Sequence, residues 1–193
     1  MTCIVAMKDR ETGDIWMGGD SAGVQGVSLT IRADEKVFEN GPYIFGFTSS
    51  FRMGNLLRYA FSPPQHPFKM GSCRFMATIF IDALRDCLKS GGYARVKDNA
   101  EAGGEFLVGY RGAIYSIHSD FQIGRVRHPF ATCGSGGRVA IGALMAMDRI
   151  GQPADTRSRV VSALKIAEAA TTGVRGPFRV ICQKRNVAGE DKC

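Results

Sequence analysis

The sequence predicts an α+β fold, a four-layer αββα sandwich in which two antiparallel sheets lie between two layers of helices. The expected elements run strands, two helices, strands, two helices and a final strand, which differs from the alternation of a doubly wound fold. Short apolar runs bounded by turn residues indicate antiparallel pairing. With 193 residues, 45% of them hydrophobic, the chain can bury one sizeable core. We expect a single domain over residues 1–185 and a polar tail over residues 186–193.

The first half of the chain begins with strands. A β-rich run starts almost at the first residue, and Gly13-Asp14 then indicates a turn. The small residues of 18–23 are typical of a loop, whereas the continuously apolar run 43–47 fits a strand covered on both faces. Apolar residues at helical spacing follow, and Pro63-Pro64 ends the first helix. The expected elements are strands at 2–8, 15–17, 28–31, 36–38 and 43–47, and helices at 52–60 and 75–88.

The second half returns to strands before the last two helices. The segment 91–104 combines glycines with several charges and is interpreted as a loop. Arg111-Gly112 joins two apolar runs as a tight hairpin. Gly134-Ser135-Gly136-Gly137 leads into a helix, and Asp155 is a typical N-cap for the last one. The expected elements are strands at 106–110, 113–117, 121–126 and 178–182, and helices at 138–150 and 156–170.

Composition and charge exclude several classes of protein. The formal charge is +7, but Lys and Arg are dispersed and the longest basic run is Lys184-Arg185, so we do not expect nucleic-acid binding. No stretch reaches the roughly 18 apolar residues of a membrane span, and the N-terminus lacks the pattern of a secretory signal. The six cysteines form no C-x-x-C pair. We therefore expect a cytoplasmic protein without membrane contact, metal or cofactor.

Thr2 is the residue whose position suggests chemistry. A threonine hydroxyl is a weak nucleophile unless an adjacent base takes its proton, and a free N-terminal amine on the same residue can do so. Such an amine has a pKa of about 7.7–8.0, so it is partly neutral near pH 7. Removal of Met1, which a small second residue normally permits, would expose this amine. A nearby Lys would lower the pKa of the amine further, and an Asp would hold that Lys in place.

Several short blocks together resemble one known family. Their order resembles proteasome β subunits and, more closely, the bacterial HslV-type peptidase. The resemblance covers roughly residues 2–50 and 104–183, and it implies the N-terminal-nucleophile hydrolase fold. The blocks are Thr2-Cys3-Ile4-Val5, Gly18-Gly19-Asp20, Lys36-Val37, Phe45-Gly46-Phe47 and Gly134-Ser135-Gly136-Gly137.

The resemblance implies a set of site residues when it is carried over position by position. Thr2 matches the nucleophile, with its own amine as general base. Asp20 matches the family's Asp after the second strand. Lys36 matches the Lys that tunes the amine.

Three further positions complete the implied set. Gly46 matches the glycine whose backbone N–H helps to stabilise the tetrahedral oxyanion. Ser135 matches the serine of the Gly-Ser-Gly turn, and Thr172 stands where the family often has a serine. The family's Asp near the end of the last long helix is replaced here by Ala169, next to Glu168.

The function implied by the resemblance is a threonine-type peptidase that works in a homo-oligomeric ring. It would hydrolyse unfolded protein delivered by a separate ATP-driven unfoldase, because this chain has no P-loop. A second hypothesis, based on the missing Asp, is a catalytically inactive building block of a larger assembly, for example a viral or phage particle, which would place it in the virion. A third is an N-terminal-nucleophile amidase acting on a small amide.

Overall fold

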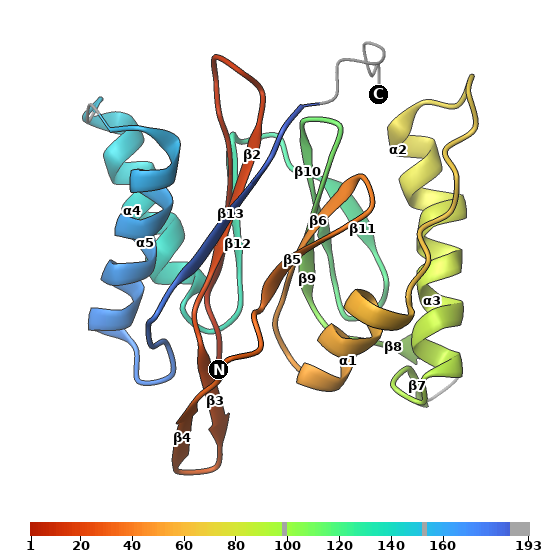
Figure 1. Cartoon of the computed structure of the whole chain (residues 1–193), viewed down its shortest axis with the longest axis horizontal. Helices are drawn as coiled ribbons and strands as arrows, with labels where there is room; N and C mark the ends of the chain where they lie inside the picture. The colour runs from red at the N-terminus through yellow and green to blue at the C-terminus, as the bar shows by residue number, and fades with distance from the viewer. Residues whose placement is uncertain (98–99, 152–153, 186–193) are drawn as a thin grey trace.

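Two antiparallel sheets face each other in the middle of the molecule (Figure 1). The computed structural model describes residues 1–97, 100–151 and 154–185. The first sheet has the order β12 (Phe130–Cys133), β1 (Ile4–Lys8), β2 (Ile15–Gly19) and β13 (Arg179–Gln183). The second has the order β11 (Ile123–Arg125), β10 (Ala113–Ile117), β9 (Phe106–Tyr110), β6 (Tyr43–Phe47) and β5 (Val37–Asn40).

Helices cover both outer faces of the pair of sheets (Figure 1), which confirms the predicted four-layer sandwich. The first sheet is covered by α4 (Gly137–Arg149) and α5 (Thr156–Ala170). The second is covered by α1 (Phe51–Asn55), α2 (Ser72–Phe75) and α3 (Ile81–Ser90). Two π-helical segments, Leu56–Ala60 and Met76–Phe80, continue α1 and join α2 to α3. No helix in these described ranges is both long enough and apolar enough to cross a membrane.

Side-chain caps fix where two of the helices begin. The side chain of Ser50 accepts from the N–H of Arg52 at the start of α1. Asp155 accepts from the N–H of Ser158 at 2.8 Å, which makes it the N-cap of α5 as the sequence predicts. Each cap satisfies a backbone donor that has no partner inside the first turn of its helix.

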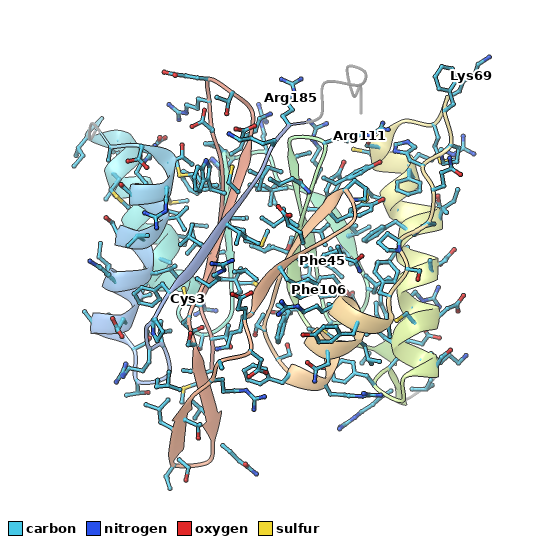
Figure 2. All side chains as sticks on the ribbon, in the orientation of Figure 1. Cys3, Phe45, Lys69, Phe106, Arg111 and Arg185 are labelled. Atoms are coloured by element: carbon cyan, nitrogen blue, oxygen red, sulfur yellow. The ribbon has the colours of Figure 1, made fainter. Side chains whose placement is uncertain are left out.

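The core has three parts, one between each pair of neighbouring layers. Between the sheets lie aliphatic side chains such as Ile4, Met17 and Ile44. The part under α1–α3 is rich in aromatic rings, among them Phe45 and Phe106 (Figure 2). β1 sends alternate side chains into the inter-sheet part and into the part under α4 and α5. This two-sided burial explains why the N-terminal run is apolar at nearly every position.

The structure contains strands that the sequence did not predict. β3 (Ala22–Gln25) was not expected, and it pairs with β4 (Ser28–Ile31), which was predicted, in a two-stranded ribbon that extends beyond the sheets (Figure 1). β7 (Arg95–Lys97) and β8 (Ala100–Ala102) pair within the segment expected to be a loop. The expected loop at 18–23 was also partly wrong, because β2 runs to Gly19 and β3 starts at Ala22. β3, β7 and β8 are defined by backbone pairing rather than by apolar alternation, so the hydrophobic pattern does not reveal them.

Gly46 lies in the middle of β6 at a point where the two sheets approach closely. A Cβ placed on Gly46 would lie 2.5 Å from Cγ2 of Ile4 and 2.6 Å from Sδ of Met17. Both atoms belong to fully buried side chains of the facing sheet. The packing of the sheets therefore requires a residue without a side chain here.

We expect Gly46→Ala to lower the free energy of unfolding by about 1–3 kcal/mol, because overpacking forces neighbouring atoms apart. Gly124→Ala in β11 is the matched control, since the described residues leave open space around a Cβ there. Urea unfolding of both variants measures the difference. Equal stability of the two variants would contradict this account of the packing.

Candidate active site

The pairing of β1 with β12 brings Thr2 beside the glycine-rich turn 134–137. The two strands are antiparallel with Ile4 opposite Cys133, so the residues before β1 lie next to those after β12. The N–H of Thr2 donates to Oγ of Ser135 at 3.1 Å, and the N–H of Gly136 donates to the Thr2 carbonyl at 3.1 Å. Ser135 is therefore fixed within hydrogen-bond distance of the Thr2 nitrogen.

Gly134 permits this close approach. Its φ of +89° lies in the left-handed region that favours glycine. A Cβ at Gly134 would also collide with the carbonyl of Thr2. A side chain at this position would push the turn away from the N-terminus of β1.

Lys36 contributes a cation directly to Thr2. Its Nζ lies 3.1 Å from Oγ1 of Thr2, 3.0 Å from Oδ1 of Asp20 and 2.6 Å from the carbonyl of Ala22. Lys36 and Asp20 are each 2% exposed, so the ion pair is shielded from water. Burial lowers the pKa of Lys36, and the charge of Asp20 opposes that shift. The structure thus brings together three of the residues that the sequence singled out.

Backbone donors hold the carboxylate of Asp20. Oδ1 accepts from the N–H of Cys3 at 2.9 Å, and Oδ2 accepts from the N–H of Ala22 at 3.0 Å. The N–H of Asp20 donates in turn to the carbonyl of Cys3 at 3.3 Å. These bonds link the start of β1 to the end of β2. They orient the carboxylate of Asp20 so that its remaining hydrogen-bond acceptor capacity is directed at the ammonium group of Lys36.

Cys3 follows Thr2 in the sequence, but its thiol is unreactive. Its side chain is fully buried. This burial, together with the charge of Asp20, raises the pKa of the Cys3 thiol to about 12. The thiol therefore stays protonated near neutral pH, and a protonated thiol is a poor nucleophile. Of these two neighbouring residues, the hydroxyl of Thr2 is the group placed to react.

A small cavity of about 70 Å³ opens beside Thr2, and sequence reasoning missed most of its wall. Gly46 is not among the lining residues, so its predicted role in oxyanion stabilisation stays a prediction. Ser49 is part of the wall and has a φ of +68°, a conformation that few residues other than glycine adopt. The small polar run 48–50, directly after β6, was the feature of the sequence that could have indicated this part of the cavity wall. The lining residues are Met1, Thr2, Ala22, Val24, Lys36, Phe47, Thr48, Ser49, Ser50 and Phe51.

Glu168 lies in the last turn of α5, and Thr172 lies on the connection that follows this helix. Oγ1 of Thr172 lies 3.9 Å from Sδ of Met1, so it reaches the N-terminal residue. Oε1 of Glu168 accepts from the N–H of Gly176 at 2.8 Å. Glu168 therefore stabilises the segment that leads into β13 and does not replace the carboxylate that Ala169 lacks.

The described part of the chain offers no metal site, because no three His, Cys, Asp or Glu side chains cluster within it. The hydroxyl of Thr2 is flanked by the buried ammonium group of Lys36, and the nitrogen of Thr2 by the hydroxyl of Ser135.

No protein-family model and no curated protein sequence matches this chain. Among solved structures, BPH from Thiobacillus denitrificans has a TM-score of 0.79 at 19% identity, covering 97% of this chain and 100% of that one. The same protein in complex with epoxomicin gives a TM-score of 0.79 at 18% identity, covering 96% of this chain and 100% of that one.

Two further structures are similar over nearly the whole chain. Eukaryotic HslV from Trypanosoma brucei has a TM-score of 0.66 at 15% identity, covering 95% of this chain and 99% of that one. Anbu, an ancestral beta-subunit from Yersinia bercovieri, has a TM-score of 0.63 at 14% identity, covering 95% of this chain and 82% of that one. At these identities the likeness establishes the fold. This chain therefore has the fold of the proteasome-like N-terminal-nucleophile hydrolases, as its sequence blocks predicted.

Proposed function

We propose that the chain is a threonine-type peptidase in which Thr2, freed of Met1, is the nucleophile. The observation that supports this most strongly is the contact of 3.1 Å between Nζ of Lys36 and Oγ1 of Thr2. A buried lysine on a threonine hydroxyl, held by a buried aspartate, is an unusual arrangement for a purely structural role.

The reaction would be acyl transfer in two stages. The free amine of Thr2 takes the hydroxyl proton while Oγ1 attacks the carbonyl carbon of the substrate peptide bond. The tetrahedral intermediate collapses, the C–N bond breaks, and the leaving nitrogen receives that proton. The first product departs as an amine, and the second stays bound to Thr2 as an ester. A water molecule, deprotonated by the same amine, then hydrolyses the ester and regenerates the hydroxyl.

Two groups would stabilise charge during these steps. The ammonium of Lys36 donates to Oγ1 and so favours its partly deprotonated form as the attack proceeds. The N–H of Ser49 lies in the cavity wall and donates locally to Oγ1 of Thr48. We propose that a substrate oxyanion replaces this local acceptor.

Met1 blocks this chemistry while it is attached. Its carbonyl makes the Thr2 nitrogen an amide and accepts a hydrogen bond from Oγ1 of Thr2 at 2.6 Å. Met1 also lines the cavity beside Thr2. Removing it would supply the base, release the hydroxyl and enlarge the space open to substrate.

The assembly and the substrate are part of the same proposal. The neighbours with this fold include HslV and a protein described as an ancestral beta-subunit. We propose a ring of identical subunits whose Thr2 sites act on unfolded polypeptide. An unfoldase driven by ATP would be a separate protein.

One observation favours a second candidate, an inactive building block of an assembly. Ala169 stands where the resemblance implies an acidic residue, and Glu168 is engaged with Gly176 instead. A site that lacks the carboxylate of the family's Asp could keep the arrangement of Thr2, Asp20 and Lys36 without catalysing peptide hydrolysis.

Epoxomicin, which is bound to the Thiobacillus denitrificans protein, provides a test that separates the two candidates. It is a peptide epoxyketone, so it offers electrophilic carbons to both a hydroxyl and an amine. We expect a covalent adduct that peptide mapping places on Thr2 of the chain lacking Met1, with Thr2→Ala as the unlabelled control. Absence of an adduct on fully processed, folded protein would favour the building block.

A further inference from the structure

A second pocket lies at the end of the sheets far from Thr2. It has a volume of about 540 Å³, within the range of small-molecule sites. Lys8 closes β1 and Thr2 precedes it, so at about 3.3 Å per residue the two ends are roughly 20 Å apart. The lining residues are Lys8, Arg10, Cys73, Gly112, Ala113, Ile114, Arg125, Val126, Arg127, His128 and Pro129.

Backbone hydrogen bonds from both sheets hold the segment that forms one wall. The N–H of Lys8 donates to the carbonyl of Pro129 at 2.6 Å, and the N–H of Val126 donates to the carbonyl of Ile114 at 2.8 Å. The segment between β11 and β12 is thereby attached to β1 on one side and to β10 on the other. The pocket is thus built from paired backbone rather than from a free loop.

The charge of this pocket is strongly one-sided. It is lined by Lys8, Arg10, Arg125, Arg127 and His128, and no Asp or Glu of the described ranges lines it. Arg10 is paired with Asp148 at 2.9 Å outside the lining. Burial lowers the pKa of Lys8, and the positive charges of Arg185 and Arg125 lower it further. The labelled Arg111 and Arg185 lie at this same end of the molecule (Figure 2). Lys8 and Arg127 thus place like charges on the same pocket wall, and an anion bound between them would relieve their repulsion.

The types of cation and the apolar part of the wall limit the class of anion that fits this pocket. Arginine guanidinium groups match phosphate oxygens with pairs of parallel hydrogen bonds, and lysine adds a compact charge. Ile114, Val126 and Pro129 add an apolar surface between these cations. The exposed ring of His128 is stacked on Phe130, with centroids 6.0 Å apart. Cations together with apolar and aromatic surface suit a phosphate ester better than a bare inorganic ion.

We propose that this pocket is a binding site for a phosphate-bearing small molecule of nucleotide size, separate from the Thr2 site. Binding at this pocket does not require removal of Met1. The test of this proposal is therefore independent of the peptidase proposal.

Isothermal titration calorimetry of the full chain tests this with two probes, ATP and sodium triphosphate, in buffer without magnesium. We expect both to bind, and the double variant Lys8→Gln/Arg127→Gln to weaken binding at least about tenfold, since each charge-assisted bond is strong. The control is Lys165→Gln/Arg157→Gln, which removes the same charges from exposed positions on α5. Arg127→Gln alone gives a second measurement if the double variant unfolds. We expect ATP to bind more tightly than triphosphate, because the apolar wall contacts the nucleoside; equal binding would contradict the assignment to a phosphate ester.

Three other results would overturn the proposal. The first is no binding of either probe at millimolar concentration. The second is equal weakening in the control, which would indicate attraction to net charge alone. The third is tighter binding of penta-glutamate than of triphosphate to the same residues, which would assign the pocket to an acidic peptide.

Discussion

Replacing Thr2 by alanine is expected to reduce peptide hydrolysis by at least about a thousandfold, because no second group can form the acyl ester. The hydroxyl of Thr2 lies 3.1 Å from Nζ of Lys36, and the adjacent thiol of Cys3 is held protonated. The loss should appear in kcat, with the fold and assembly unchanged. Release of a fluorogenic group from short peptides measures it.

Thr2→Ser is the control for this variant. Serine keeps the hydroxyl and is also small, so Met1 can be removed from both variants. We expect Thr2→Ser to retain measurable turnover and to form the epoxomicin adduct. Turnover by Thr2→Ala equal to that of Thr2→Ser would show that another residue is the nucleophile.

Lys36→Met is expected to destabilise the protein by about 3–5 kcal/mol and to abolish turnover. Lys36 and Asp20 form a buried pair at 3.0 Å, and removing one partner leaves an uncompensated buried charge. The loss of the ammonium also removes the donor to Oγ1 of Thr2. Urea unfolding gives the stability, and the peptide assay gives the activity.

The double variant Asp20→Asn/Lys36→Met separates these two effects. Without the carboxylate, the buried charge is gone, so we expect the double variant to recover about 1–3 kcal/mol relative to Lys36→Met alone. Activity should stay lost. Recovery of activity together with stability would mean that Lys36 supports the fold and takes no part in the chemistry.

The sequence predicted the layers and most of the elements because burial leaves a strong signal. The continuously apolar run at 43–47 is β6, and the cap at Asp155 begins α5. It also brought Thr2, Asp20 and Lys36 into one hypothesis, and the structure places these three in contact. The register of β1 with β12, which locates Ser135 beside Thr2, could be inferred from the resemblance but not from hydrophobicity.

The parts that could not be predicted depend on backbone geometry and distant contacts. The strand at 28–31 was predicted, but its partner β3 begins inside a run of small residues that is typical of a loop, so no apolar periodicity indicates the ribbon. Ser49 takes a positive φ without being glycine, and its place in the cavity wall follows from the path of the chain. The second pocket, far from Thr2, brings together Lys8 and Arg127, which are more than one hundred residues apart in the sequence. Cations so far apart look dispersed when only the sequence is known.

The measurement that tests the central claim most directly is the intact mass of the assembled, peptide-hydrolysing protein. The account predicts that active material begins at Thr2 and that turnover rises in proportion to the fraction that has lost Met1. Full turnover by protein that still carries Met1 would contradict it, because the nitrogen of Thr2 would then be an amide, whose lone pair is delocalised into the carbonyl of Met1 and cannot accept the proton of the hydroxyl.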